Sequence, residues 1–279
     1  MKLRFTKMHG AGNDFVVIDA THEPFIPTPE LLSALSDRRF GVGCDQVLVV
    51  ERPSMPDVDF NYRIFNSDGS QSGQCLNGSR CFARFVRERG LSKKEVIRVR
   101  TCTSLLELQL LPDGLVRVNA GPPRFDPAQI PFTAPARAPR YSIALAGSQL
   151  LEIGAVSTGN PHAVISVSDV DTAPVQEIGK ALQSHPAFPE RVNVGFLQVL
   201  DRGHARLRVF ERGAGETLAC GSGACAAAVV ARMWESVDAV VQMQVRGGTL
   251  TIEWQGEGSP VFISGPAVTV YQGEMEWPR

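Results

Sequence analysis

The sequence predicts an α+β fold of two pseudo-symmetric domains, each a mixed or antiparallel β-sheet wrapped around a central α-helix. The first observation behind this prediction is an internal repeat. The segment FNSDGSQSGQCLNGSRC in the first half resembles FERGAGETLACGSGAC in the second half. In both segments a strand-like run ends in Phe, a polar loop containing Gly follows, and a Cys precedes a small turn that contains Gly.

The spacing of the repeated features is the second observation. In chain order the equivalent positions are Asn13, Gln46, Asn66 and Cys75 in the first half, and Asn160, Asn193, Glu211 and Cys220 in the second half. The intervals are 33, 20 and 9 positions in the first half and 33, 18 and 9 positions in the second half. Four features in one order at nearly constant separation indicate two equivalent domains.

Hydrophobic periodicity is the third observation. Residues 60–64 and 205–209 alternate apolar and polar side chains, which is typical of half-buried strands. Further strands are expected at residues 96–100, 105–111, 115–120, 163–167, 247–254 and 261–265. The segment CFARFVRERG predicts a helix that ends at Gly90. The segment AAAVVARMW after Cys225 is apolar apart from one Arg, which indicates a helix enclosed by other structure.

These elements give the expected domain boundaries. Residues 1–120 form the N-terminal repeat domain, which is rejoined by a C-terminal strand at 264–279, and residues 121–263 form the C-terminal repeat domain. The segment at 121–140 is rich in Pro and marks the crossing between the halves. We expect this segment to run as an extended connection over the surface.

Composition excludes several classes of function. The chain carries 28 basic and 29 acidic residues, so no basic field attracts nucleic acid or an anionic membrane. No apolar run approaches the roughly 20 residues that span a bilayer, and the N-terminus lacks the apolar core of a signal peptide. We therefore expect a cytoplasmic protein that binds neither nucleic acid nor membrane.

Six cysteines are then expected to be reduced thiols. Their close pairs lack the C-x2-C spacing of zinc ligands, so no metal site is predicted. Four of the six are interpreted as packing residues, namely Cys44, Cys81, Cys102 and Cys225. The remaining two, Cys75 and Cys220, hold equivalent places in the repeat.

Each of these two cysteines lies where a loop meets the N-terminus of a predicted helix. Unpaired N–H groups and a positive partial charge at this end should lower the thiol pKa from about 8.5 toward neutrality. The same N–H groups can bind a carboxylate. Inversion at an α-carbon needs a base on one face and an acid on the other. One tuned thiol from each half, in a site that closes on the substrate and excludes water, would supply both without a cofactor.

Polar residues at fixed places relative to the cysteines are candidate substrate ligands. Asn13, Asn160 and Asn193 are either turn residues or ligands. Glu211 and Arg212 are either a solvated pair or the two halves of a grip on a zwitterion. His162 follows Asn160 and Pro161, and is either structural or a group that tunes a nearby thiol.

Several segments resemble the motifs of the bacterial diaminopimelate epimerase family. They are KMHGAGNDF, GVGCDQ, YRIFNSDGS, QCLNGSRCFARF, TGNPH, RVNVGF and ERGAGETLACGSGACAAAV. The resemblance covers nearly the whole chain. It implies a pyridoxal-independent isomerase, with no cofactor or metal, that interconverts LL- and meso-2,6-diaminopimelate in lysine and peptidoglycan-precursor biosynthesis. Cys75 and Cys220 would be its acid/base pair.

The resemblance also implies the remaining site residues. His162 and Glu211 would modulate the thiols, and Tyr271 would lie at the interface of a homodimer. The substrate, a small zwitterionic amino acid, would contact Asn13, Gln46, Asn66, Leu76, Asn77, Asn160, Asn193, Glu211, Arg212, Gly221 and Ser222.

The sequence departs from the family pattern in its N-terminal half. Leu76 replaces the usual Gly after the first catalytic cysteine, and Cys44 replaces an aromatic residue beside Gln46. The segments 71–74 and 101–106 are also unusual. These departures leave two alternatives open: a racemase of another amino acid with the same two-thiol mechanism, or a catalytically weak relative that serves as a binding protein.

Overall fold

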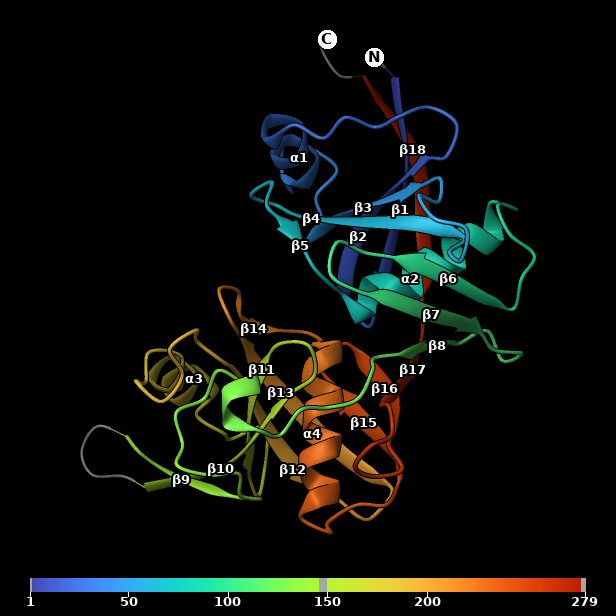
Figure 1. Cartoon of the computed structure of the whole chain (residues 1–279). Helices are drawn as coiled ribbons and strands as arrows, with labels where there is room; N and C mark the ends of the chain where they lie inside the picture. The colour runs from blue at the N-terminus through green and yellow to red at the C-terminus, as the bar shows by residue number, and fades with distance from the viewer. Residues whose placement is uncertain (1, 146–149, 277–279) are drawn as a thin grey trace. The chain divides into compact units, whose positions relative to one another are not determined.

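The computed structural model describes residues 2–145 and 150–276. The chain forms two compact units (Figure 1). The first unit consists of Met1–Val118 with Gly265–Arg279, and the second of Asn119–Ser264. Among the described residues, no helix is long and apolar enough to cross a membrane.

The first unit is a mixed sheet. Its strands are β1 (Lys2–Gly10), β2 (Asn13–Ala20), β3 (Gln46–Glu51), β4 (Phe60–Asn66), β5 (Gln71–Ser72), β6 (Val96–Arg100), β7 (Leu105–Leu110), β8 (Val116–Asn119) and β18 (Val268–Glu276). β1 pairs antiparallel with both β2 and β18. β2 and β3 run parallel, as do β4 and β6, whereas β3 pairs antiparallel with β4.

Two helices pack against this sheet, and each contacts a different set of its buried side chains. On α1 (Pro29–Ser36), Leu31, Leu32 and Leu35 join one core with Val47 and Val49. On α2 (Leu76–Glu88), the buried Phe82 ring lies 4.6 Å from the ring of Tyr62. Successive residues of a strand point to opposite faces, so each strand supplies both cores.

The second unit is built in the same way. Its strands are β9 (Tyr141–Ala144), β10 (Leu150–Ser157), β11 (Pro161–Ser166), β12 (Asn193–Val199), β13 (His204–Glu211), β14 (Gly215–Thr217), β15 (Val240–Val245), β16 (Gly248–Glu253) and β17 (Phe262–Gly265). β11 and β12 run parallel, as do β13 and β15, and β12 pairs antiparallel with β13.

Two helices also serve this unit. On α3 (Val175–Gln183), Val175, Ile178 and Leu182 join a core with strand residues that include Phe196 and Phe210. The second helix, α4 (Gly221–Met233), has buried residues along nearly its whole length, as the sequence predicts for an enclosed helix.

The internal repeat is confirmed by the order and pairing of these elements. The two units have the same connectivity and the same parallel and antiparallel strand pairs. The elements follow the order β2–α1–β3–β4–β5–α2–β6–β7 in the first unit and β11–α3–β12–β13–β14–α4–β15–β16 in the second. Phe15 pairs with Gln46 in one unit and His162 with Asn193 in the other, two residues beyond Asn13 and Asn160 respectively. His162 therefore occupies the place that Phe15 holds in the first unit.

Each sheet packs against the expected central helix, α2 or α4, and carries a further helix, α1 or α3, that the sequence analysis did not predict. One expectation needs correction. The Pro-rich segment 121–140 is no mere surface connection, because Phe125, Ile130 and Phe132 are buried. The ring of Phe132 stacks on that of Phe188 at 4.8 Å. Proline fixes the backbone of such a segment but leaves its apolar side chains free to pack.

Candidate active site

Cys75 is the N-cap residue of α2. Its backbone is extended, with φ −146° and ψ 105°, and its Sγ accepts a hydrogen bond from the Gly78 N–H at 3.3 Å. A thiol in this place is half-buried and faces the unpaired N–H groups of the helix. Only Gly fits at position 78, since a Cβ there would lie 2.5 Å from the buried Tyr62 hydroxyl oxygen.

The side chain of Asn13, at the start of β2, is held against Cys75. The Cys75 Sγ lies 3.7 Å from Asn13 Oδ1, to which it donates. Asn77 Nδ2 donates to the same oxygen at 3.2 Å, and Asn13 Nδ2 donates to Asp45 Oδ2 at 2.8 Å. The structure thus brings Asn13, Cys75 and Asn77 together in the first unit.

Gln46 and Asn66 meet across the β3–β4 pair. Gln46 Nε2 donates to Asn66 Oδ1 at 2.9 Å, and Asn66 Nδ2 donates to the Ser70 hydroxyl at 3.0 Å. In the described part of the chain, the buried Gln46 Oε1 has no hydrogen-bond partner. A buried acceptor without a donor is costly, so this oxygen has the capacity to accept a hydrogen bond from a bound molecule.

The structure shows where the residues that depart from the family pattern lie. Leu76, the first residue of α2, is buried, and its carbonyl accepts from Arg80 Nη1 at 3.4 Å. Cys44 lies in the core beneath α1, where burial raises its thiol pKa, in agreement with its interpretation as a packing residue. The segments 71–74 and 101–106 contact each other, because the Thr103 hydroxyl donates to the Gly73 carbonyl at 2.8 Å.

Cys220 is the N-cap residue of α4 and is 4% exposed. Its Sγ lies 3.6 Å from the Ser222 hydroxyl oxygen. A Cβ at Gly223 would come within 3.3 Å of Cys220 Sγ and 3.1 Å of Val209, so the bare backbone of this turn keeps its N–H groups close to the sulfur. Gly221 and Ser222 form the first turn of the helix, and the Thr158 hydroxyl donates to the Ser222 carbonyl at 3.1 Å.

The expected drop in the pKa of Cys220 is wrong. Burial first, and then the charge of the Glu211 carboxylate and a hydrogen bond to it, raise the pKa of Cys220 well above its ordinary value. The contacts with Ser222 and the Gly223 N–H act in the opposite direction but are smaller. The dipole of one helix does not outweigh desolvation together with a neighbouring negative charge. Cys220 is therefore a neutral thiol at neutral pH.

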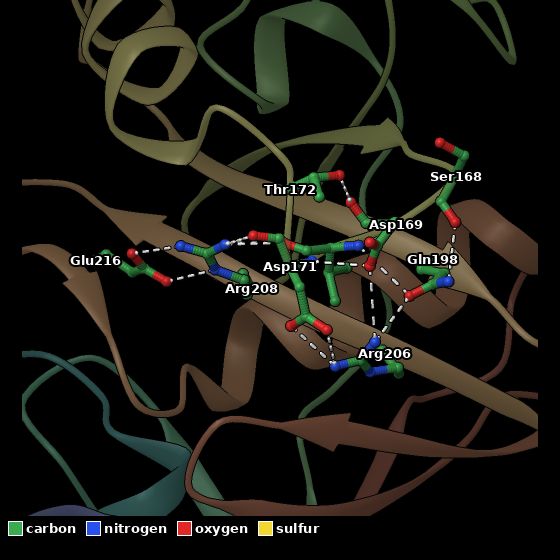
Figure 2. Close-up of polar contacts among 9 residues, drawn as sticks. Ser168, Asp169, Asp171, Thr172, Gln198, Arg206, Arg208 and Glu216 are labelled. Atoms are coloured by element: carbon green, nitrogen blue, oxygen red, sulfur yellow. Dashed lines mark hydrogen bonds and ion pairs between the residues drawn. The ribbon is translucent and has the colours of Figure 1, made fainter.

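Glu211 is fixed by its neighbours. The Thr217 hydroxyl on β14 donates to the Glu211 carboxylate at 2.5 Å, and Gln183 Nε2 on α3 donates to its backbone carbonyl at 2.8 Å. Figure 2 shows how β14 is attached to β13: Arg208 binds the Glu216 carboxylate through two nitrogens, at 2.7 and 3.0 Å. This ion pair lowers the pKa of Glu216 and anchors the strand that carries Thr217.

The segment between β11 and α3 is attached to the same strand. Arg206 reaches the Asp171 carboxylate at 2.9 and 3.0 Å (Figure 2). Arg208 donates to the Val170 carbonyl at 2.7 Å. α3 begins shortly beyond this segment, so these contacts also hold the helix that carries Gln183.

The second unit contains a further cluster of polar side chains near Glu211. Its members are Asn160, His162, Asn193 and Arg212. His162 Nε2 lies 2.9 Å from Asn160 Oδ1. Asn193 is buried, donates to the Pro161 carbonyl at 3.2 Å and accepts from the Arg212 N–H at 2.8 Å. Burial, followed by the charge of Arg212, lowers the pKa of His162 to about 3, so its ring is neutral.

Tyr271 lies on β18 of the first unit. Its ring contacts Phe5 edge-on at 6.1 Å, and it is 45% exposed beside Val268 and Val270, which are also exposed. Among residues 2–145 and 150–276, no group of three or more His, Cys, Asp or Glu side chains is arranged to hold a metal ion.

Comparison with known proteins identifies the family of this chain. A family model described as diaminopimelate epimerase matches residues 5–125 and 154–277. The chain is 57% identical to a diaminopimelate epimerase from Ectopseudomonas mendocina and 56% identical to one from Stutzerimonas stutzeri, over 275 residues and 99% of both chains in each case. The chain belongs to the diaminopimelate epimerase family. As a member of it, the chain is an isomerase.

Solved structures of more distant proteins share the fold of this diaminopimelate epimerase family member. A hydroxyproline epimerase from Agrobacterium vitis, with bound trans-4-hydroxy-L-proline, has a TM-score of 0.71 at 16% identity and covers 98% of this chain and 92% of its own. A PhzF-family protein from Bacillus anthracis has a TM-score of 0.70 at 19% identity, with 99% and 100% covered. At these identities the likeness concerns the α+β fold alone.

Some residues of the diaminopimelate epimerase site were missed by sequence reasoning. Asp45 contacts Asn13, Arg80 contacts Asn77, and Thr217 contacts Glu211. A signal was available for all three, because Asp45, Arg80 and Thr217 lie within the motifs GVGCDQ, QCLNGSRCFARF and ERGAGETLACGSGACAAAV. Arg80 is fully buried in α2, and a charged residue is rarely buried unless it is paired.

Proposed function

We propose that this chain is a diaminopimelate epimerase that inverts one α-carbon of its substrate with Cys75 and Cys220 as acid and base. The observation that carries the proposal is the position of each cysteine as the N-cap of a central helix, one in each repeat, with polar side chains packed beside it. Identity of 57% over nearly the whole length to a diaminopimelate epimerase supports the substrate.

The protonation state of Cys220 suggests the division of labour. Cys220 begins as a thiol because burial and Glu211 raise its pKa, so it serves as the acid. Cys75, once it has given up its S–H proton, takes the α-hydrogen as a proton, and the Cys220 S–H gives its proton to the opposite face of the same carbon. One C–H bond breaks and another forms, and the negative charge passes from the sulfur of Cys75 to that of Cys220. In the reverse reaction the two roles are exchanged.

Backbone N–H groups at the starts of α2 and α4 would bind the α-carboxylate and stabilise the carbanion, since the N-terminus of a helix is a site for anions. Leu76 and Asn77 on one helix, and Gly221 and Ser222 on the other, supply these groups. The Gln46 Oε1 acceptor and the Glu211 carboxylate suit ammonium groups. Asn66, Asn160, Asn193 and Arg212 would hold the distal amino-acid group, with His162 as a neutral ring beside them.

The remaining parts of the proposal concern assembly and location. A homodimer would form through β18 at Tyr271, where Val268 and Val270 are exposed as well. Apolar side chains grouped on one surface are typical of an interface. The proposed reaction, in lysine and peptidoglycan-precursor biosynthesis, belongs in the cytoplasm. It uses no cofactor, because the thiols and the helix N-termini supply proton transfer and charge stabilisation.

Hydrogen exchange at the α-carbon tests the substrate. The protein is incubated in deuterated water with LL-diaminopimelate, with lysine, and with a panel that includes proline and glutamate, and α-deuterium is measured by NMR. We expect exchange with formation of the meso isomer from diaminopimelate. Lysine should exchange about tenfold to a hundredfold more slowly, because it lacks the distal carboxylate for Arg212 and a charge-assisted hydrogen bond contributes about 1.5–3 kcal/mol.

The same assay separates the alternatives. Exchange with a different amino acid and none with diaminopimelate would identify a racemase whose pocket is changed beside Leu76. Absence of exchange with every compound, in the presence of a thiol reductant, would identify a binding protein and overturn the proposal.

A further inference from the structure

A directed chain of hydrogen bonds passes beside Cys75. Arg80 Nη2 donates to Asn77 Oδ1 at 2.9 Å, and Asn77 Nδ2 donates to Asn13 Oδ1 at 3.2 Å. Asn13 Nδ2 then donates to Asp45 Oδ2 at 2.8 Å. We refer to Arg80, Asn77, Asn13 and Asp45 as the relay. Each of its hydrogen bonds is donated in the same direction, from Arg80 toward Asp45.

The two ends of the relay determine its direction. A guanidinium has only donors, so the oxygen of Asn77 must face Arg80. An ionised carboxylate has only acceptors, so the nitrogen of Asn13 must face Asp45. Both constraints leave Asn13 Oδ1 toward Cys75, and an amide flip at Asn13 would set donor against donor at Asn77 and acceptor against acceptor at Asp45.

Each end is itself anchored. Arg80 is fully buried and donates to the Pro266 carbonyl at 3.3 Å. Asp45 accepts from Arg38 at 2.7 Å and from the Asp14 N–H at 3.1 Å. Asp14 binds Arg38 through both carboxylate oxygens, at 2.7 and 2.9 Å, so the pair holds the loop that carries Asp45.

The orientation of Asn13 affects the sulfur directly. Its Oδ1 lies 3.7 Å from Cys75 Sγ and accepts a hydrogen bond from the S–H group, which favours the thiol. The Gly78 N–H, at 3.3 Å, favours the thiolate instead. Tyr62 on β4 and Cys81 on α2 are titratable groups of the same unit that interact with Cys75, and the charge of Arg80 on α2 acts on Cys81.

We propose that Asp45 is a positioning residue which, through the relay, keeps the carbonyl of Asn13 turned toward the Cys75 thiol. This inference rests on the proposed role of Cys75 as an acid–base group. Asp45 acts through its acceptor oxygen and not through its charge, since it is exposed and screened by water.

Two variants distinguish the effect of the Asp45 charge from the effect of its acceptor oxygen. Asp45→Asn keeps an acceptor oxygen for Asn13 and removes the charge, whereas Asp45→Ala removes both. Both are made in a Cys102→Ser background, because Cys102 is exposed and would react with the probe. Asp57→Ala, at an exposed aspartate between β3 and β4, serves as the control. The rate of Cys75 alkylation by iodoacetamide is followed across pH by mass spectrometry of the peptide that contains it.

Loss of the S–H···O contact increases the fraction of Cys75 that is present as thiolate. Iodoacetamide should therefore alkylate Cys75 about threefold to tenfold faster in Asp45→Ala at pH 7. In Asp45→Asn and Asp57→Ala, Cys75 should be alkylated at the same rate as in the Cys102→Ser protein. Equal acceleration in both Asp45 variants would show a charge effect and overturn the proposal, as would no change in Asp45→Ala. Alkylation needs no turnover, so its outcome is independent of α-hydrogen exchange, and circular dichroism confirms that each variant is folded.

Discussion

Replacement of either Cys75 or Cys220 by alanine is expected to lower the rate of diaminopimelate epimerisation by about 10²–10⁴-fold, the usual contribution of a positioned acid or base. Each variant loses one of the two proton-transfer groups, and inversion requires both. The measurement is kcat in both directions, from the LL and from the meso isomer, and both should fall together because the thiols exchange roles.

Two other cysteines provide matched controls on the same helices. Cys81 on α2 and Cys225 on α4 are both fully buried. Burial raises the pKa of Cys81 to about 12, so this thiol does not ionise at neutral pH. Cys81→Ala and Cys225→Ala should therefore keep activity within a few-fold while they fold. If an alanine at 75 or 220 were no worse than these controls, the assignment of the two catalytic thiols would be wrong.

Glu211→Gln is expected to lower the pKa of Cys220 and to reduce epimerisation at pH 7 by about tenfold to a hundredfold. The pKa falls because one of the two main causes of its elevation, the carboxylate charge, is removed while burial remains. The rate falls because a charge-assisted hydrogen bond to the substrate, about 1.5–3 kcal/mol, is replaced by a neutral one.

The sign of the pH effect follows from the same cause. With a lower pKa, Cys220 loses its proton at lower pH, so the alkaline limb of the rate profile should move toward neutral pH. Thiolate absorbance near 240 nm, measured across pH in a background that carries both Cys75→Ala and Cys102→Ser, follows Cys220 without the exposed Cys102 thiol. Glu177→Gln, at an exposed position on α3, should change neither profile. An alkaline limb that stays in place in Glu211→Gln would contradict the electrostatic role of this carboxylate.

Much of the fold could be predicted from periodicity and repetition. The alternation at 60–64 and 205–209 lies within β4 and β13, and the apolar run after Cys225 lies within α4. These signals are strong because each segment buries one face or all faces. Helix α1 was missed although its start carries a capping signal, Thr28 followed by Pro29, because its eight residues give few turns of periodicity.

The site could be predicted only in part. Repeat spacing placed Asn13 beside Cys75 and Glu211 near Cys220, since equivalent loops recur at equivalent distances. The elevated pKa of Cys220 could not be read from the sequence, because it depends on burial and on the distance of a carboxylate nine positions away. The relay through Asp45 was hidden for a similar reason: donor and acceptor geometry is a three-dimensional property.

Cys75 and Cys220 are proposed to act on opposite faces of one α-carbon. Two such sulfurs must come close together, so mild oxidation of the ligand-free enzyme with diamide should join them in a disulfide. Mass spectrometry of the digested protein should find the Cys75 and Cys220 peptides linked, with activity lost, and a thiol reductant should restore it. If the oxidised protein keeps its activity with both peptides unlinked, the two thiols do not share one carbon.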